Sequence, residues 1–165
     1  MNKEKRLEIL RSAMEIELNG IELYRTAAEK TEDRQAKEML KFLADEEVKH
    51  FEALKKMYDK VNSGKKTEVK LPSQGKPKFS KIFSEKFMEN LKGKNYEYSV
   101  LTTGLLLEQN SQEFYKKQKE LAEDEEERKL FEELEKWEFG HYQMLLNEYN
   151  NIKIKFWEDN NFQPF

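Results

Sequence analysis

Hydrophobic residues recur at every third or fourth position along most of this chain, with polar residues between them. The first stretch with this pattern runs from about Lys3 to Lys30, and the second ends near Val61. Two further stretches cover about residues 96–121 and 124–149. Such a period places the hydrophobic side chains on one face of an α-helix. The pattern therefore predicts four long amphipathic helices.

The breaks between these stretches predict where the helices end. Asp33 offers an N-cap for the second helix, and residues 62–64, which read Asn-Ser-Gly, end it. Residues 62–80 hold two of the three prolines of the chain, so an extended connection is predicted there. A short helix is predicted at about residues 80–91.

These elements predict an all-α fold in which two helical hairpins pack as a four-helix bundle. The bundle is expected over residues 1–150, with the crossover between the hairpins at about residues 62–95. Residues 151–165 are rich in aromatic side chains and are predicted to form a C-terminal tail that docks on the bundle or on a second subunit.

Composition narrows the classes of function. Charged residues make up 38% of the chain, and the formal net charge of -3 gives no reason to expect nucleic acid binding. The chain has no cysteine, which excludes internal disulfides, zinc ribbons and iron–sulfur clusters. The N-terminus lacks the apolar core of a signal peptide, and no run of about 18 apolar residues is present. We therefore expect a cytoplasmic protein that does not associate with membranes.

The two hairpins repeat each other with a shift of 91 residues. Twelve of the 42 positions from residue 17 to residue 58 carry the same amino acid as their counterparts, without a gap. The matched residues include two pairs of glutamates, the only two histidines and a pair of tyrosines: Glu17 with Glu108, Glu47 with Glu138, His50 with His141, and Tyr24 with Tyr115. The hairpins therefore read as duplicates.

The repeat places these residues at matching heights in the bundle. Residues equidistant from the turn of an antiparallel hairpin lie side by side, and the midpoints of the glutamate pairs within the hairpins fall at residues 32 and 123, inside the predicted turns. Each glutamate therefore lies about 22 Å from its turn, at about 1.5 Å per residue. Each histidine follows a glutamate by three residues and shares its helix face.

The glutamates lie on hydrophobic helix faces, because Leu43, Glu47, His50 and Leu54 form one continuous stripe. Four buried carboxylates without compensation would be strongly unfavourable or would take up protons. Two divalent cations would balance their charge, and one glutamate from each of two helices with Glu-x-x-His from the other two is a ligand set of di-iron and di-manganese bundles. The predicted metal ligands are Glu17, Glu47, His50, Glu108, Glu138 and His141. The competing interpretation is that they form ion pairs or satisfied polar groups.

The other repeated residues are predicted to support or flank this site. Tyr24 and Tyr115 are expected either to hydrogen-bond to the ligands or only to pack in the core. Glu22 and Glu113 turn about 140° away from the ligand face and are predicted to face solvent. No catalytic residue beyond the metal ligands and no organic cofactor site are predicted.

At these residues the sequence resembles the ferritin-like di-iron proteins, and most of all their rubrerythrin branch. The resemblance covers about residues 5–150 and rests on Glu17 with Tyr24, Glu108 with Tyr115, and the two Glu-x-x-His segments. It implies a ferritin-like bundle with two iron ions, for which manganese is the alternative because the same ligands suit both metals. Storage ferritins are a weaker match, since they lack a second Glu-x-x-His.

The chain departs from rubrerythrins at two points. It has no cysteine-ligated rubredoxin domain, which typically supplies electrons in that family. One turn after Glu108, where rubrerythrins carry a further glutamate used in ligand exchange, this chain has Ser111.

The resemblance therefore implies an oxidoreductase that reacts with hydrogen peroxide or dioxygen and takes electrons from a separate electron-donor protein. A homodimer is also expected. The alternatives are a ferroxidase that serves iron detoxification and a non-enzymatic iron-binding or sensing module.

Overall fold

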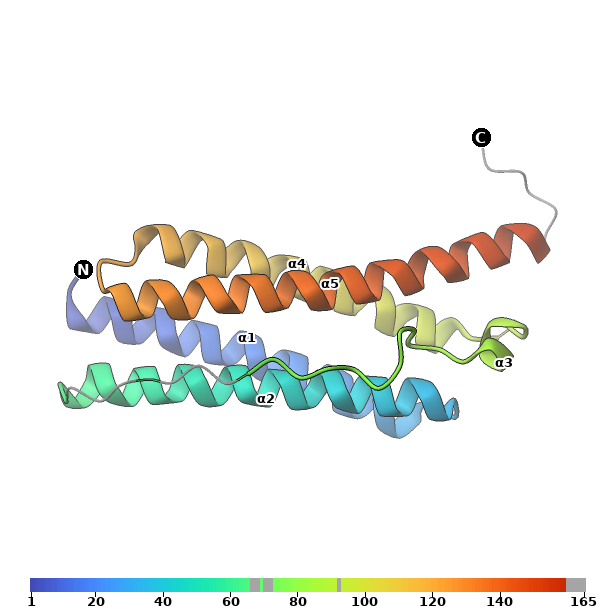
Figure 1. Cartoon of the computed structure of the whole chain (residues 1–165), viewed down its shortest axis with the longest axis horizontal. Helices are drawn as coiled ribbons and strands as arrows, with labels where there is room; N and C mark the ends of the chain where they lie inside the picture. Colours follow the sequence, from blue (N-terminus) through green and yellow to red (C-terminus); the bar gives the residue numbers. More distant parts are fainter. Residues whose placement is uncertain (66–68, 70–72, 92, 160–165) are drawn as a thin grey trace.

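The computed structural model is a bundle of four long helices that lie along a common axis (Figure 1). The first antiparallel hairpin consists of α1 (Lys3–Lys30) and α2 (Arg34–Ser63), and the second consists of α4 (Asn95–Leu121) and α5 (Glu125–Asp159). The crossover runs back along α2 and carries the one-turn helix α3 (Glu85–Met88) before α4 begins. The predicted all-α, ferritin-like bundle of two hairpins is confirmed.

The structure describes residues 1–65, 69, 73–91 and 93–159, and all regular secondary structure within them is helical. One predicted boundary is wrong, because α5 does not end near Tyr149 but continues to Asp159. Ile152 explains part of this extension, since its side chain is buried in the core. Most of the predicted tail is therefore helix, and residues 160–165 lie outside the described residues.

Local signals fix the helix ends of the first hairpin. The Asp33 carboxylate accepts a hydrogen bond of 2.8 Å from the backbone N–H of Ala36 and caps α2, as predicted. Gly64 ends α2 with φ at 68°, a left-handed conformation in which a side chain would be unfavourable. In the crossover, Ser84 caps α3 by accepting from the N–H of Phe87. These caps satisfy backbone groups that the helices leave unpaired.

The hydrophobic core consists of two clusters, one toward each end of the bundle. Leu43 and Leu145 belong to the cluster near the turn between α1 and α2, and Leu54 and Leu134 belong to the other cluster. Fully burying one leucine side chain stabilises a fold by about 1.5–3 kcal/mol. The two clusters hold the helices rigidly on both sides of a polar layer at mid-length.

Carboxylates on the helices hold the crossover against the bundle. Glu46 of α2 accepts a hydrogen bond of 2.8 Å from the N–H of Gly75, and Glu148 of α5 accepts from two backbone N–H groups at residues 82 and 83. A Cβ atom at Gly75 would lie 2.6 Å from Glu46 Oε1 and 2.9 Å from Phe42 Cε2, so a side chain there would displace both groups. Gln74 Nε2 lies 3.4 Å from where a Cβ of Gly140 on α5 would stand. The crossover therefore covers the seam between α2 and α5.

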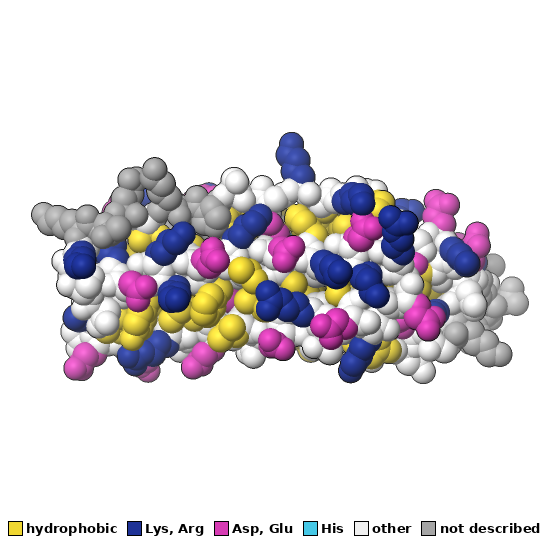
Figure 2. Space-filling model, turned by 90° about the horizontal axis from the view of Figure 1, so that it is seen from below, with side chains coloured by type: hydrophobic (Ala, Val, Ile, Leu, Met, Phe, Trp, Pro, Cys, Tyr) yellow, Lys and Arg dark blue, Asp and Glu magenta, His cyan; other side chains and the backbone are white. Residues whose placement is uncertain are grey.

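The face of the first hairpin that points away from the second hairpin carries charged side chains of both signs around a hydrophobic stripe (Figure 2). Leu18 of α1 is 45% exposed, and Val48 and Phe51 of α2 are half-buried. The structure is that of one chain, so the homodimer expected from the sequence stays a prediction. None of the helices in the described part of the chain is long and apolar enough to cross a membrane.

Candidate metal centre

Four glutamates and two histidines meet in the polar layer between the two hydrophobic clusters. Each is at most 2% exposed. The six residues come from all four long helices: Glu17 from α1, Glu47 and His50 from α2, Glu108 from α4, and Glu138 and His141 from α5. The structure therefore brings together every residue that the sequence predicts as a metal ligand.

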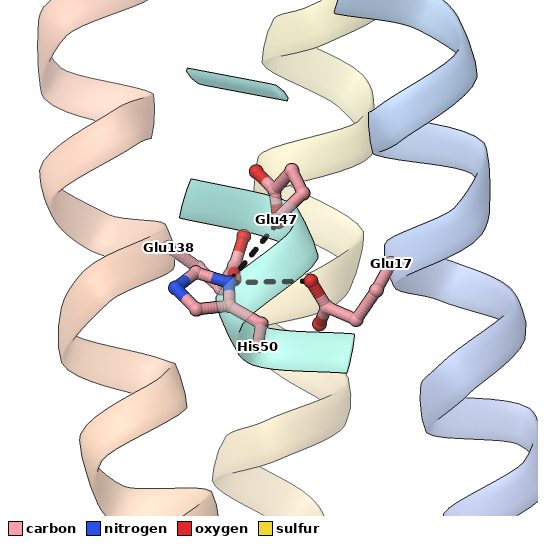
Figure 3. A group of neighbouring side chains, drawn as sticks. All are labelled: Glu17, Glu47, His50 and Glu138. Atoms are coloured by element: carbon pink, nitrogen blue, oxygen red, sulfur yellow. Dashed lines mark hydrogen bonds and ion pairs between the residues drawn. The ribbon is translucent and has the colours of Figure 1, made fainter. Parts of the chain in front are cut away.

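These side chains form two overlapping groups, each of which could hold a metal ion. The first group is Glu17, Glu47, His50 and Glu138 (Figure 3), and the second is Glu47, Glu108, Glu138 and His141. One ligand atom from every residue of a group lies within 4.8 Å of the others. Glu47 and Glu138 belong to both groups. They are therefore placed to bridge two ions, while the remaining residues are each placed to hold one.

Three carboxylates surround Nδ1 of His50. This nitrogen lies 2.9 Å from Glu138 Oε1, 3.1 Å from Glu47 Oε2 and 3.2 Å from Glu17 Oε2. One N–H group cannot serve three acceptors, and Glu138 Oε1 has no hydrogen bond despite the short distance. Neighbouring ligands at about 2.1 Å from one metal ion are separated by about 3 Å. The observed spacing therefore also suits ligands arranged around a cation.

Glu47 connects the two histidines. Its Oε2 atom lies 3.1 Å from His50 Nδ1, and its Oε1 atom lies 3.1 Å from His141 Nδ1. Glu108 Oε2 lies 3.7 Å from the same nitrogen of His141. The two imidazole rings are nearly parallel, with centroids 5.6 Å apart. A carboxylate that presents one oxygen to each imidazole is arranged as a bridging ligand would be.

Burial and the neighbouring charged groups together shift the pKa values of the carboxyl groups in opposite directions. Burial first, and the nearby Glu47 carboxylate second, raise the pKa of Glu17 to about 8. The same two causes raise the pKa of Glu138 well above its ordinary value. Burial also acts on Glu47, but the imidazoles of His141 and His50 outweigh it and hold the pKa of Glu47 well below its ordinary value. Glu47 therefore carries negative charge more readily than Glu17 and Glu138.

The histidines respond to the carboxylates around them. Burial lowers the pKa of His50, but Glu17 and Glu47 outweigh it and raise this pKa to about 10. Glu108 and Glu47 likewise overcome the effect of burial and raise the pKa of His141 well above its ordinary value. In metal-free protein both imidazoles therefore favour the doubly protonated, positively charged form. A metal ion bound there would have to displace protons from them.

Tyr24 and Tyr115 bond crosswise between the hairpins. The Tyr24 hydroxyl on α1 donates to Glu108 on α4, and the Tyr115 hydroxyl on α4 donates to Glu17 on α1. Burial first, and the accepting carboxylates second, raise the pKa values of both tyrosines well above 10.0, so both hydroxyls keep their protons. Each tyrosine thus hydrogen-bonds to a predicted ligand and fixes its orientation, a role that partners of metal ligands commonly have.

Several atoms of this cluster have no hydrogen-bond partner among the described residues. They are both oxygens of Glu138, Oε2 of Glu108, and Nε2 of His50 and His141. A buried polar atom left unsatisfied costs about 1–3 kcal/mol. A metal ion would satisfy the carboxylate lone pairs, and carboxylate oxygens with imidazole nitrogen suit iron and manganese. The residues present therefore fit a pair of such ions.

Three residues that the sequence analysis did not assign to the site shape its walls. Trp137 stacks on His50 with ring centroids 4.8 Å apart. A Cβ atom at Gly20 would lie 3.1 Å from Glu47 Cγ, and one at Gly104 would lie 3.3 Å from the Tyr24 hydroxyl. Glycine inside a helix costs about 1 kcal/mol relative to alanine. Each of these glycines lies about one turn from a predicted ligand, and this placement is the signal that could have revealed them.

Three further positions discussed in the sequence analysis are Glu22, Glu113 and Ser111. Glu22 and Glu113 are exposed, as predicted. Ser111 is buried, and its hydroxyl donates to the carbonyl of Leu107 in its own helix at 2.9 Å. No carboxylate therefore occupies this position one turn after Glu108.

The bundle and its paired carboxylate–histidine groups define a helical protein of the ferritin-like, metal-binding class. A family model described as Rubrerythrin matches residues 8–149. The chain belongs to the rubrerythrin family, which is part of the ferritin-like di-iron superfamily. Comparison with curated proteins and with solved structures gives no match.

Proposed function

We propose that this chain is a di-iron oxidoreductase that reduces hydrogen peroxide or dioxygen with electrons from an external donor. The observation that carries the proposal is the pair of overlapping groups that share Glu47 and Glu138, because it provides ligands for two neighbouring ions. The other two carboxylates and the two imidazoles complete the ligand sets. Membership of the rubrerythrin family favours iron, although the same donor atoms also suit manganese.

Iron held by these residues would supply the electron transfer that carboxylates and imidazoles cannot perform. The protein's own contribution is position and shielding. Tyr24 and Tyr115 hold the carboxylates of Glu108 and Glu17 in fixed orientations. Trp137, which is 6% exposed, and the leucines of both clusters keep bulk water away from the site. Such an apolar surrounding limits side reactions and controls access to the metal.

Ser111 supports a second candidate function. Without a carboxylate at this position, the described site has only the four predicted ligand carboxylates in its two groups. A site without this additional ligand could oxidise iron stoichiometrically, as a ferroxidase, without a reductive cycle. The third alternative is an iron-binding or sensing module in which the metal only stabilises the bundle.

One series of measurements tests these functions on protein purified without chelator. We expect about two irons per chain, ferric absorption that reductant bleaches and peroxide restores, and repeated turnover when reductant is in excess. One oxidation per site without turnover would favour the ferroxidase, and metal-dependent stability without either reaction would favour the binding module. Failure of folded protein to take up iron or manganese would refute all three. The proposal places the protein in the cytoplasm, where reductants are plentiful.

A further inference from the structure

The one-turn helix α3, the start of α4 and the end of α5 come together near one end of the bundle (Figure 1). Side chains of these segments line a hollow. Its volume is about 850 Å³, within the range of about 300–1,000 Å³ that is usual for sites of small organic ligands. Aromatic and aliphatic side chains form most of its wall: Phe87, Leu91, Tyr98, Tyr149, Ile152 and Trp157. These walls suit the flat, apolar body of an organic molecule.

The charge of the hollow is positive. Lys94 and Lys153 line it, and the lining contains no aspartate or glutamate. The Lys94 ammonium lies 5.4 Å from the ring centroid of Phe87, and the Lys153 ammonium lies 4.6 Å from that of Trp157. Neither ammonium forms an ion pair with a carboxylate of the described residues. Two cations without carboxylate partners beside an apolar wall favour an anionic ligand.

The polar groups of the wall add directed hydrogen bonds. The Tyr98 hydroxyl donates to the Tyr149 oxygen at 3.0 Å, so the hydrogen of Tyr149 is left to donate elsewhere. Asn95 also lines the hollow and adds an amide. A few polar groups within an apolar wall fix the orientation of a ligand.

We propose that this hollow binds a flat aromatic anion of the class of flavin mononucleotide. The tricyclic ring would lie against Tyr98, Tyr149 and Trp157, and the phosphate would pair with Lys94 and Lys153. Phosphate oxygens accept charge-assisted hydrogen bonds from ammonium groups, and aromatic rings stack on one another.

The role of the ligand rests on the proposed function, whereas its binding does not. Reducing one hydrogen peroxide to two waters consumes two electrons and two protons, and oxidation of one reduced flavin to flavin releases the same number of each. Tyr149 lies eight residues beyond His141 on α5, about 12 Å along the helix axis. Electrons can cross this distance through protein, while the flavin itself stays away from the metal ligands. The external donor would then be a small molecule.

The binding test is a titration of the purified protein with flavin mononucleotide, followed by quenching of flavin fluorescence. We expect saturable binding of one flavin per chain. Lys94→Ala and Lys153→Ala should each weaken it about tenfold, the equivalent of one charge-assisted hydrogen bond of about 1.5 kcal/mol. Lys116→Ala, at an exposed position on α4 outside the hollow, should leave it unchanged. Thermal unfolding of each variant checks that the fold is retained.

Two other ligands test the chemistry of the site. Riboflavin, which lacks the phosphate, should bind at least about tenfold more weakly, and dodecanoate, which lacks the aromatic ring, should not displace the flavin. Equal affinity for riboflavin, displacement by dodecanoate, or unchanged affinity in both lysine variants would overturn the proposed site.

A separate reaction tests the role of the ligand. Photoreduced flavin mononucleotide should bleach the ferric absorption of iron-loaded protein, and Lys153→Ala should slow this about tenfold at subsaturating flavin. Dithionite, which needs no site, should reduce both proteins at the same rate. Turnover with dithionite but not with reduced flavin would overturn the donor role and leave the proposed function standing. Flavin binding without turnover by any reductant would refute the proposed function alone.

Discussion

Glu138 and Glu47 occupy equivalent positions in the two hairpins, but the same substitution should affect them in opposite ways in metal-free protein. Glu47 contacts a nitrogen of both His50 and His141 at hydrogen-bonding distance. Neither oxygen of Glu138 has a hydrogen-bond partner among the described residues, and Oε1 lies 2.9 Å from His50 Nδ1 without forming a hydrogen bond. Methionine is unbranched like glutamate and has no carboxylate, so Glu138→Met and Glu47→Met form a matched pair.

The magnitudes follow from these contacts. Burial and the neighbouring carboxylates raise the pKa of Glu138 well above its ordinary value, so this group is unfavourable in ionised form. Replacing an unsatisfied buried polar group by an apolar one should stabilise the metal-free protein by about 1–3 kcal/mol. Glu47→Met would leave His141 with only Glu108, at 3.7 Å, and should cost about 1.5–3 kcal/mol. The two variants should therefore differ by at least about 2.5 kcal/mol.

The assay is thermal unfolding after treatment with chelator, followed by titration with Mn²⁺, which does not oxidise during the measurement. For a domain of this size, about 2.5 kcal/mol corresponds to a difference in Tm of about 5 °C or more. At a metal concentration of about 100 times Kd, binding should stabilise the unsubstituted protein by about 2.7 kcal/mol. Both variants should gain much less, because each loses a ligand shared by both groups.

Glu22→Met provides the control, since Glu22 is exposed on α1 away from the site. This variant should unfold and respond to metal like the unsubstituted protein. The reasoning fails if Glu138→Met destabilises the metal-free protein as much as Glu47→Met does. Binding of two metal ions per chain by either variant would contradict the assignment of bridging ligands.

Three further predictions concern the groups around the site. Tyr24→Phe removes the hydroxyl that donates to a predicted ligand and should weaken metal binding about 10–100-fold, measured by competition with a chelator; unchanged affinity would exclude this role. Gly75→Ala would place a Cβ atom 2.6 Å from a glutamate oxygen and should destabilise the protein by about 1–3 kcal/mol in urea unfolding. Gly140→Ala, with 3.4 Å to its nearest neighbour, should be neutral or stabilising by up to about 1 kcal/mol. Equal effects of the two substitutions would argue against the close contact between the crossover and α2. The Tm of metal-free protein should fall as the pH rises from 6 to 10, because two groups bind protons more tightly in the folded protein than in the unfolded chain. They are His50, with its pKa raised to about 10, and Glu17, with its pKa raised to about 8. A Tm that rises over this range would contradict these shifts.

The sequence predicts the helices and the meeting of the six candidate ligands because both depend on local spacing. The stripe on α2 and its repeat on α5 give the helix faces directly, and two turns at equal distance from the glutamates give their heights. The end of α5 could not be read in this way. Residues 152–156 read Ile-Lys-Ile-Lys-Phe, an alternation that does not favour a helix. The burial of Ile152 against other elements explains part of the extension, and that contact is not visible in the sequence.

The sequence pattern does not predict which side chains of one hairpin contact the other hairpin. Tyr24 shares a helix face with Glu17, yet its hydroxyl crosses the bundle to Glu108. Periodicity defines which face of a helix is buried, but it does not define how far one hairpin is shifted along the axis relative to the other. The reach of a tyrosine across the bundle depends on that shift, so it appears only in the folded structure.

The positions where the duplicated hairpins differ explain how a symmetric set of ligands has unequal surroundings. Glu46 and Trp137 are equivalent in the repeat, but Glu46 binds the N–H of Gly75 in the crossover, whereas Trp137 stacks on His50. The crossover lies along the seam between α2 and α5, where Glu46 and Glu148 both accept hydrogen bonds from its backbone. Neither carboxylate is repeated in the other hairpin, since the counterpart of Glu148 is Met57. The six predicted ligands are duplicated, as binding of two metal ions would require. Their neighbours differ because the chain connects the hairpins only once, and Glu47 and Glu138 also differ in their hydrogen bonds.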